Sequence, residues 1–194
     1  HCYSLQGLAL DWVAENWGAP DTLGQRIRPL LGEQDDGAAL ALGELLDAAL
    51  QERQKALSAL KRPWVEWITE LEVFYQQASG AGKFNGNKLK PDIFNPRFER
   101  LREWCCDDMA ELSFKENSGK PGFFKRLTLE GLEDACKKGI ELNLSDAVRE
   151  ALLDMESLEE RLSAVAEPSE TALRHAAAWI RQRFDREKRQ RAEM

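Results

Sequence analysis

The sequence predicts an all-α fold, an irregular multi-helix domain of eight or so helices. Apolar residues recur at helical spacing along most of the 194 residues. Alternating β-branched runs of useful length, which would predict strands, are absent. Hydrophobic residues make up 43% and charged residues 31% of the chain, a balance typical of a folded protein and not of a disordered one. We therefore expect a single helical subdomain over residues 1–194.

The first half of the chain predicts two short helices and a long one. The first helix is expected to end at Gly18-Ala19-Pro20, because Gly and Pro interrupt helices. Asp21 is a candidate N-cap for a short helix that reaches about Leu31. Leucines and alanines at helical spacing predict a long amphipathic helix from Ala38 to about Leu60. Pro63 is expected to break this helix or to lie in the first turn of the next one.

The segment that follows predicts a protruding helical-hairpin arm at about residues 64–111. Apolar residues at helical intervals predict one helix that ends near Ser79-Gly80 and another from about Pro96 to Glu111. Between them, residues 80–96 contain three Gly, two Pro and three Asn, which are residues of turns and not of helix interiors. We therefore expect a loop that joins two helices of one hairpin.

The second half predicts further helices from their end signals. Thr128 can cap a short helix that reaches Lys138, with Gly139 as the residue after its C-cap. Ser145 is expected to start another helix, and Pro168 is expected to open the last one. The last helix should pack through a stripe at helical spacing, formed by Leu173, Ala176, Ala177, Ile180 and Phe184.

Charge is distributed unevenly along the chain. The net charge of −7 argues weakly against a protein that is basic throughout. Residues 33–52 hold six acids and no base, and residues 133–160 hold nine acids and three bases. In contrast, residues 174–191 hold seven bases and two acids, and residues 83–103 hold six bases and three acids. This asymmetry is typical of a protein that faces nucleic acid locally.

The basic loop and the helix after it supply the candidate binding residues. Their cations can neutralise phosphates, and their asparagines can donate neutral hydrogen bonds. An ordinary solvated basic loop is the alternative interpretation. Because no base-reading helix is evident, any binding is expected to be independent of sequence. Phe84 and Phe94 could pack beside a sugar or base, although we expect them to anchor the loop to its own helices. The candidates for DNA contact are Lys83, Asn85, Lys88, Lys90, Arg97, Arg100 and Arg102.

The sequence contains no recognisable catalytic, cofactor-binding or metal site. Gly80-Ala81-Gly82-Lys83 is similar to part of a phosphate loop, but Phe84 stands where that motif needs a hydroxyl, and no strand precedes it. His175 is expected on a helix surface, with no nucleophile elbow in the sequence. The four cysteines form no C-x-x-C pair, and free, mostly buried thiols are expected. No apolar run approaches the roughly 20 residues that span a bilayer.

The final helix carries the closest family resemblance. It has no capping signal at Met194, which predicts a truncated helix, so we expect a piece of a larger intracellular protein. The string from Arg186 to Met194, REKRQRAEM, follows Ala178-Trp179-Ile180-Arg181 on this last helix. It resembles the helix that precedes a Gly-Phe-Asp-Asp segment in RecB-type helicases, the beta subunit of bacterial exodeoxyribonuclease V. Residues 33–62 and 110–168 match that family in helical character only.

Two further stretches resemble the same family in the same order. His1-Cys2-Tyr3, Trp17-Gly18-Ala19-Pro20 and the helix from Leu23 to Leu31 resemble the start of its inserted subdomain 1B. Gly82-Lys83-Phe84-Asn85, followed by the segment from Phe98 to Trp104, resembles the protruding arm of that insertion. The resemblance therefore extends over most of the chain.

The resemblance implies a role within a larger enzyme. In such helicases, subdomain 1B is inserted in the first RecA-like motor domain, and its arm lies against duplex DNA ahead of the fork. The parent unwinds and degrades DNA ends in recombinational repair, in the bacterial cytoplasm, with ATP, magnesium, and alpha and gamma subunits. None of its phosphate-loop, magnesium-binding or nuclease residues falls in this segment. The arm positions that carry over are Lys83, Asn85, Lys88 and Lys90.

Three hypotheses follow. The first is a non-catalytic subdomain that contacts duplex DNA within an ATP-dependent helicase–nuclease. The second is a scaffold that packs on the motor domain and partner subunits without touching DNA. The third, an independent helical enzyme, would need a catalytic site that the sequence does not contain.

Overall fold

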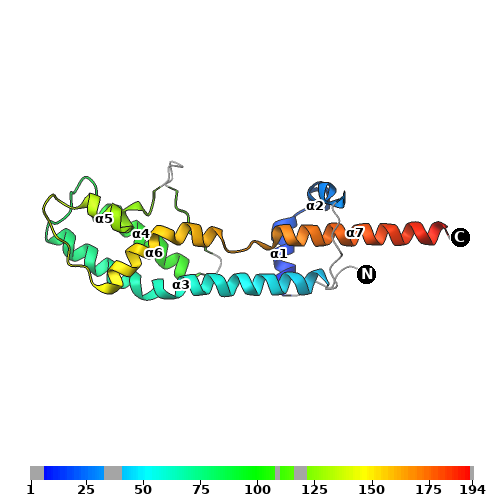
Figure 1. The fold of residues 1–194 in the computed structure, drawn as a ribbon, viewed down its shortest axis with the longest axis horizontal. Helices are drawn as coiled ribbons and strands as arrows, with labels where there is room; N and C mark the ends of the chain where they lie inside the picture. Colours follow the sequence, from blue (N-terminus) through cyan, green and yellow to red (C-terminus); the bar gives the residue numbers. More distant parts are fainter. Residues whose placement is uncertain (1–6, 33–40, 108–109, 116–121, 193–194) are drawn as a thin grey trace. The chain divides into compact units, whose positions relative to one another are not determined.

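The computed structural model is all-α, as the sequence predicts, and describes residues 7–32, 41–107, 110–115 and 122–192 (Figure 1). An isolated antiparallel bridge pairs Phe84 with Cys136. No helix in the described part of the chain is long and apolar enough to cross a membrane. The α-helices are α1 (Leu8–Trp17), α2 (Pro20–Ile27), α3 (Leu42–Gly80), α4 (Pro91–Cys106), α5 (Leu129–Ala135), α6 (Asp146–Ser163) and α7 (Pro168–Ala192), with 3-10 helices η1 (Arg28–Gly32) and η2 (Lys125–Leu127).

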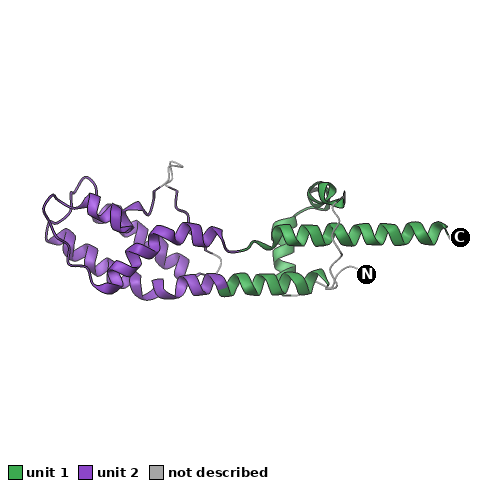
Figure 2. Ribbon diagram, in the orientation of Figure 1, with its two compact units in different colours: residues 1–55, 166–194 green, residues 56–165 purple. Residues whose placement is uncertain are grey.

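The chain divides into two compact units, each with its own core (Figure 2). Unit 1 comprises residues 1–55 and 166–194, and unit 2 comprises residues 56–165. The expectation of one subdomain over residues 1–194 stays a prediction.

Unit 1 is built from α1, α2, η1, the first part of α3 and the whole of α7, whose first part contributes to the core. Gly18, with a φ of 58°, ends α1, as predicted. The helix α2 has Ala19 and not Asp21 at its N-cap position, since Pro20 already occupies the first turn. Asp47 of α3 accepts a hydrogen bond from the backbone N–H of Ala9 at 3.1 Å. The buried core residues are Ala9, Trp17, Ile27, Leu42, Leu46, Ala172, Leu173, Ala176 and Ala177.

The long helix α3 corrects one expectation, because Pro63 neither breaks it nor begins a new helix. Proline lacks an N–H, so the helix forgoes the bond to the carbonyl of Ala59 there. The residues that follow compensate: Trp64, Ile68 and Leu71 recur at helical spacing and are at most 2% exposed. Burying large apolar side chains contributes roughly 1.5–3 kcal/mol each, enough together to outweigh the roughly 3 kcal/mol that a proline costs.

Tyr75 lies in the centre of the core of unit 2. Its ring centroid lies 5.5–5.7 Å from those of Phe84, Phe94 and Phe98, which come from the loop after α3 and from α4. The buried hydroxyl donates a hydrogen bond to the carbonyl of Arg126 at 2.6 Å. Phe84 and Phe94 are thus anchors of the fold, as expected. The helix pair α3–α4 shares its core with α5 and α6, and its role as an arm of a larger protein stays a prediction.

The structure confirms the predicted starts of α5, α6 and α7, and it corrects the end of α5 and both bounds of α4. The Thr128 hydroxyl accepts from the N–H of Gly131, the Ser145 hydroxyl accepts from the N–H of Val148, and Pro168 opens α7. The helix α5 ends at Ala135 and not at Lys138, because the following residues form the bridge to the loop. The helix α4 spans Pro91–Cys106 in place of the predicted 96–111, since Pro91 fits its first turn.

Candidate nucleic-acid interface

The Gly-rich segment after α3 is a helix terminator. The N–H of Lys83 bonds to the carbonyl of Ala78 at 3.0 Å, and the N–H of Gly82 bonds to that of Ser79 at 2.9 Å. These two bonds form a Schellman motif, in which the residue after the C-cap takes a positive φ. Gly82 has a φ of 67°, so the glycine that is similar to a phosphate-loop residue has a conformational role here.

The loop after this terminator is fixed at both ends by apolar side chains. Phe84 and Leu89 are 5% and 1% exposed, respectively. Between them, the Asn85 side chain accepts a hydrogen bond from the N–H of Asn87 at 3.1 Å, which forms an Asx-turn. The carbonyl of Asn85 accepts from the N–H groups of Lys88 and Leu89. Asn85, a predicted DNA contact, therefore shapes the loop.

The loop is also bonded to the segment that follows α5. The N–H of Asn85 donates to the carbonyl of Ala135 at 2.8 Å, and the N–H of Lys137 donates to the carbonyl of Lys83 at 2.9 Å. These bonds flank the antiparallel bridge between Phe84 and Cys136. Residues far apart in the sequence are thereby held side by side by backbone bonds.

Lys88 is held by an acidic partner on α5. Its Nζ donates to the Asp134 carboxylate at 2.7 Å and to the Asp134 carbonyl at 3.0 Å. The other carboxylate oxygen accepts from Arg126 at 2.6 Å. The hydrogen bonds from Lys88 and then from Arg126 lower the pKa of Asp134 from its ordinary 3.8 to about 2. Asp134 is therefore ionised at neutral pH and connects the loop, η2 and α5.

Four of the predicted contacts are engaged at or along α4. Lys90 precedes the helix, with its Nζ 3.5 Å from the Asp92 carboxylate. Arg97 donates from Nε to the carbonyl of Phe123 and from Nη1 to that of Ile93, so it acts within the fold. The other two pair with glutamates: Arg100 with Glu103 and Arg102 with Glu72. The structure thus gathers Lys83, Asn85 and Lys88 beside α5, and it distributes the others along α4.

Two cations beside Lys83 were not among the sequence candidates. Lys137 and Lys138 follow α5 and are exposed. They belong to a turn closed by a 3.2 Å bond from the N–H of Ile140 to the carbonyl of Lys137, with Gly139 at a φ of 80°. The string Lys137-Lys138-Gly139 could have predicted a basic turn from the sequence. Only the backbone bond between Lys137 and Lys83 shows that this turn lies beside the loop after α3.

The second basic segment lies on α7. The stripe expected to pack is correct for Leu173, Ala176 and Ala177, but Ile180 and Phe184 are 41% and 59% exposed. The core of unit 1 includes residues of α7 up to Ala177, and no residue of this helix from Trp179 to Ala192 is buried.

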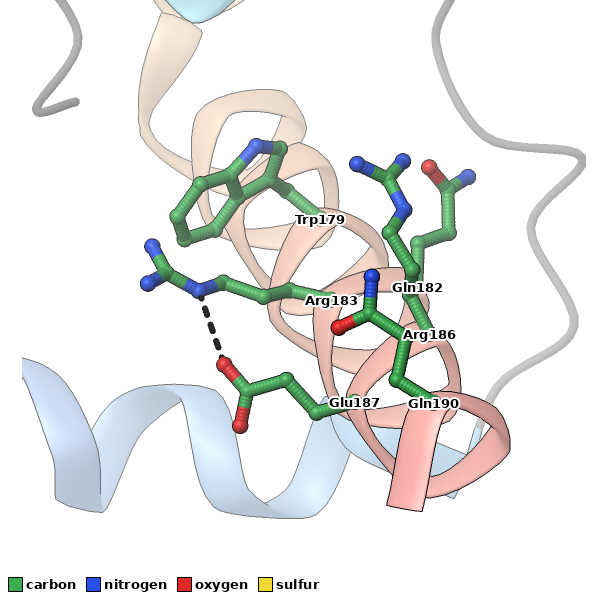
Figure 3. Close-up of a pocket in the computed structure, with 6 residues that line it drawn as sticks. All are labelled: Trp179, Gln182, Arg183, Arg186, Glu187 and Gln190. Carbon is green, nitrogen blue, oxygen red and sulfur yellow. Dashed lines mark hydrogen bonds and ion pairs between the residues drawn. The ribbon is translucent and has the colours of Figure 1, made fainter. Parts of the chain in front are cut away.

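Figure 3 shows the exposed part of α7, where six side chains line an open hollow of about 330 Å³. Arg183 lies over the ring of Trp179, 5.4 Å from its centroid, and its Nε is 3.3 Å from the Glu187 carboxylate. All six residues come from this one helix: Trp179, Gln182, Arg183, Arg186, Glu187 and Gln190.

His175 and the cysteines correct two smaller expectations. His175 is 6% exposed and not on a helix surface, since residues 172–178 of α7 are buried except for Arg174. Cys105 and Cys136 are half-buried free thiols, and Cys106 is exposed. Burial raises the pKa of the Cys105 thiol to about 11. Among the described residues, no group of His, Cys, Asp and Glu side chains could hold a metal ion.

Some predicted features lie outside the described residues: the His1-Cys2-Tyr3 segment, the start of the long helix at Ala38, and Glu193-Met194. No protein-family model, no curated protein and no solved structure matches the chain.

Proposed function

We propose that this chain is a non-catalytic subdomain of an ATP-dependent DNA helicase–nuclease of the RecB type, and that it contacts duplex DNA. The REKRQRAEM helix and the Gly82-Lys83-Phe84-Asn85 segment resemble that family, and this resemblance supports the proposal that the parent protein is such an enzyme. In this proposal the contact is to phosphates and is independent of base sequence. ATP, magnesium, and the alpha and gamma subunits belong to the parent.

The observation that carries the DNA contact is the anchored position of Lys83. Buried Phe84 and the bonds to Ala135 and Lys137 hold the backbone of the loop in place. Among the ion pairs of the described residues, none includes Lys83. A cation on a fixed loop loses less conformational entropy on binding a phosphate than one on a flexible chain.

A scaffold function is the second candidate, and the pairing of the other cations favours it. Lys88, Arg100 and Arg102 each have a carboxylate partner in the fold. Arg97 donates to two backbone carbonyls. If these pairs persist, the cations stabilise the unit, and the chain would serve by packing on a motor domain and its partner subunits.

The test is a fluorescence-anisotropy titration of a labelled duplex at several salt concentrations between about 0.05 and 0.2 M. The proposal predicts a dissociation constant in the range of roughly 10⁻⁴ to 10⁻⁶ M, which rises steeply with salt. Lys83→Gln should weaken binding to duplexes of any sequence and should reduce the salt slope by about one. Lys88 is left intact, because replacing it would also remove one of the two cationic partners of Asp134.

Lys55→Gln is the matched control. It removes the same charge from an exposed side chain of α3 that pairs with Glu52 at 2.7 Å, in unit 1. Equal loss of binding in both variants would mean that only net charge matters, which contradicts the assignment to the loop. No binding by the wild-type chain, together with association to a motor domain or partner subunit, would favour the scaffold.

A further inference from the structure

The bridge between the loop and the end of α5 places two lysines opposite each other. Side chains alternate between the two faces of an extended segment. Phe84 points into the core, so Lys83 and Lys137, which flank the bridged residues, belong to the other face. The 2.9 Å bond from the N–H of Lys137 to the carbonyl of Lys83 fixes this register.

Like charges directly opposite each other destabilise a bridge unless something neutralises them. Asp134 is already bonded to Lys88 and Arg126. Burial raises the pKa of the neighbouring Cys136 thiol, Glu133 raises it further, and the positive charge of Lys83 lowers it. Among the ion pairs within the described ranges, neither Lys83 nor Lys137 has a partner, whereas Lys88 in the same loop does.

Two glycines leave room for this arrangement. The Lys137 Nζ lies 3.7 Å from the position that a Cβ on Gly82 would occupy, so this ammonium group lies over the turn that ends α3. Gly139, with a φ of 80°, turns the chain directly after Lys138. Lys138 is thereby exposed at the tip of the turn, one residue from Lys137.

We infer that Lys83 and Lys137, with Lys138 beside them, form a binding site for one phosphate group. Ammonium groups bind phosphate oxygens as point charges, and two of them on neighbouring segments suit a group with several anionic oxygens. The identification of this phosphate as one of a DNA backbone rests on the proposed function. Bound phosphate would also neutralise the two opposed cations.

The first experiment compares Lys137→Gln with Lys55→Gln in the duplex titration. At about 0.05 M salt, one lost phosphate contact weakens binding about tenfold and lowers the salt slope by about one. The control should keep wild-type affinity. If the wild-type chain binds the duplex and Lys137→Gln binds it equally well, the inference is overturned and the proposed function stands.

Lys137→Glu separates a binding role from a structural one. A carboxylate opposite Lys83 replaces a like-charge pair with an opposite-charge pair, so the urea midpoint should stay equal or rise. DNA binding should nevertheless fall at least as far as in Lys137→Gln. A lower midpoint with unchanged DNA binding would show that Lys137 serves the fold alone.

A titration with inorganic phosphate, followed by NMR, tests the site without DNA. The amides of Gly82, Lys137 and Gly139 should shift together and saturate, and Lys137→Gln should abolish this response. If the wild-type chain binds no duplex but shows these shifts, the proposed function fails and the phosphate site stands. No saturating shift at these amides would refute the site.

Discussion

Gly131→Ala is predicted to destabilise unit 2, although alanine normally favours a helix. Gly131 lies within α5, and a Cβ at this position would come 1.7 Å from the carbonyl oxygen of Lys125. The same added atom would lie 3.1 Å from the Thr128 hydroxyl, which caps α5 by accepting from the N–H of Gly131. The contact is to backbone, so a side-chain rotation cannot relieve it.

The magnitude follows from three opposing contributions. Alanine in a helix interior gains about 1 kcal/mol over glycine. Separating the Cβ from the Lys125 carbonyl requires a shift of more than about 1 Å, and such overpacking costs roughly 1–3 kcal/mol. Displacing Thr128 also weakens a cap that contributes about 1 kcal/mol. The net loss should be roughly 1–3 kcal/mol, or about 5 °C in melting temperature for each kcal/mol.

The assay is urea unfolding followed by circular dichroism, with amide hydrogen exchange measured separately for each unit. Gly24→Ala is the matched control, because Gly24 lies inside α2 and nothing lies within 4 Å of its added Cβ. That variant should stabilise unit 1 by up to about 1 kcal/mol. If Gly131→Ala were as stable as the wild type, the close approach of η2 to α5 would be refuted.

Three further changes test other parts of unit 2. Tyr75→Phe removes the donor to the Arg126 carbonyl and should lower the free energy of unfolding by about 1–2 kcal/mol. Because burial raises the pKa of Tyr75, ultraviolet titration should show no ionisation of this residue until alkali unfolds the protein; earlier ionisation would contradict its burial. Pro63→Ala restores an N–H within α3 and should raise the free energy of unfolding by up to about 3 kcal/mol, and the urea midpoint with it. A lower midpoint would mean that the proline ring makes essential contacts. The pKa of Asp134 is lowered in the folded state, so its ionised carboxylate contributes fully to the free energy of unfolding above pH 3.8. This contribution is lost as the pH falls toward 2. The stability difference between wild type and Asp134→Asn should therefore shrink over this range in urea titrations, and a difference independent of pH would exclude an ionic role.

The sequence predicted those parts of the fold that local chemistry determines. Thr128 and Ser145 cap helices because their hydroxyls reach an N–H three residues later. Pro168 opens α7 because its fixed φ suits a first turn. The alternation of buried and exposed positions in α3 and α6 follows directly from helical spacing. These features depend on residues a few positions apart.

The features that the sequence did not predict depend on distant residues. Pro63 remains inside α3 because packing outweighs its local cost. His175 is buried because α7 is surrounded on most sides at that turn. Lys137 joins the candidate site through a backbone bond to Lys83. None of these outcomes can be derived from neighbouring residues, since each requires the position of another element.

The ion pairs around Asp134 do not decide between a DNA contact and a scaffold, because pairing leaves much of the positive charge in place. Residues 83–90 hold three bases and no acid, and residues 125–138 hold four bases and three acids, which leaves a local excess of four positive charges.

The whole chain, in contrast, carries a net charge of −7. This charge repels DNA only over distances shorter than the Debye length, which is about 30 Å at 0.01 M salt and about 10 Å at 0.1 M. Around 0.1 M salt the distant acids are screened, while the lysines in contact with a phosphate are not. A DNA-contacting chain should therefore associate faster when salt rises from about 0.01 M, before counterion competition weakens binding above about 0.1 M. A scaffold with solvated cations would show no such maximum.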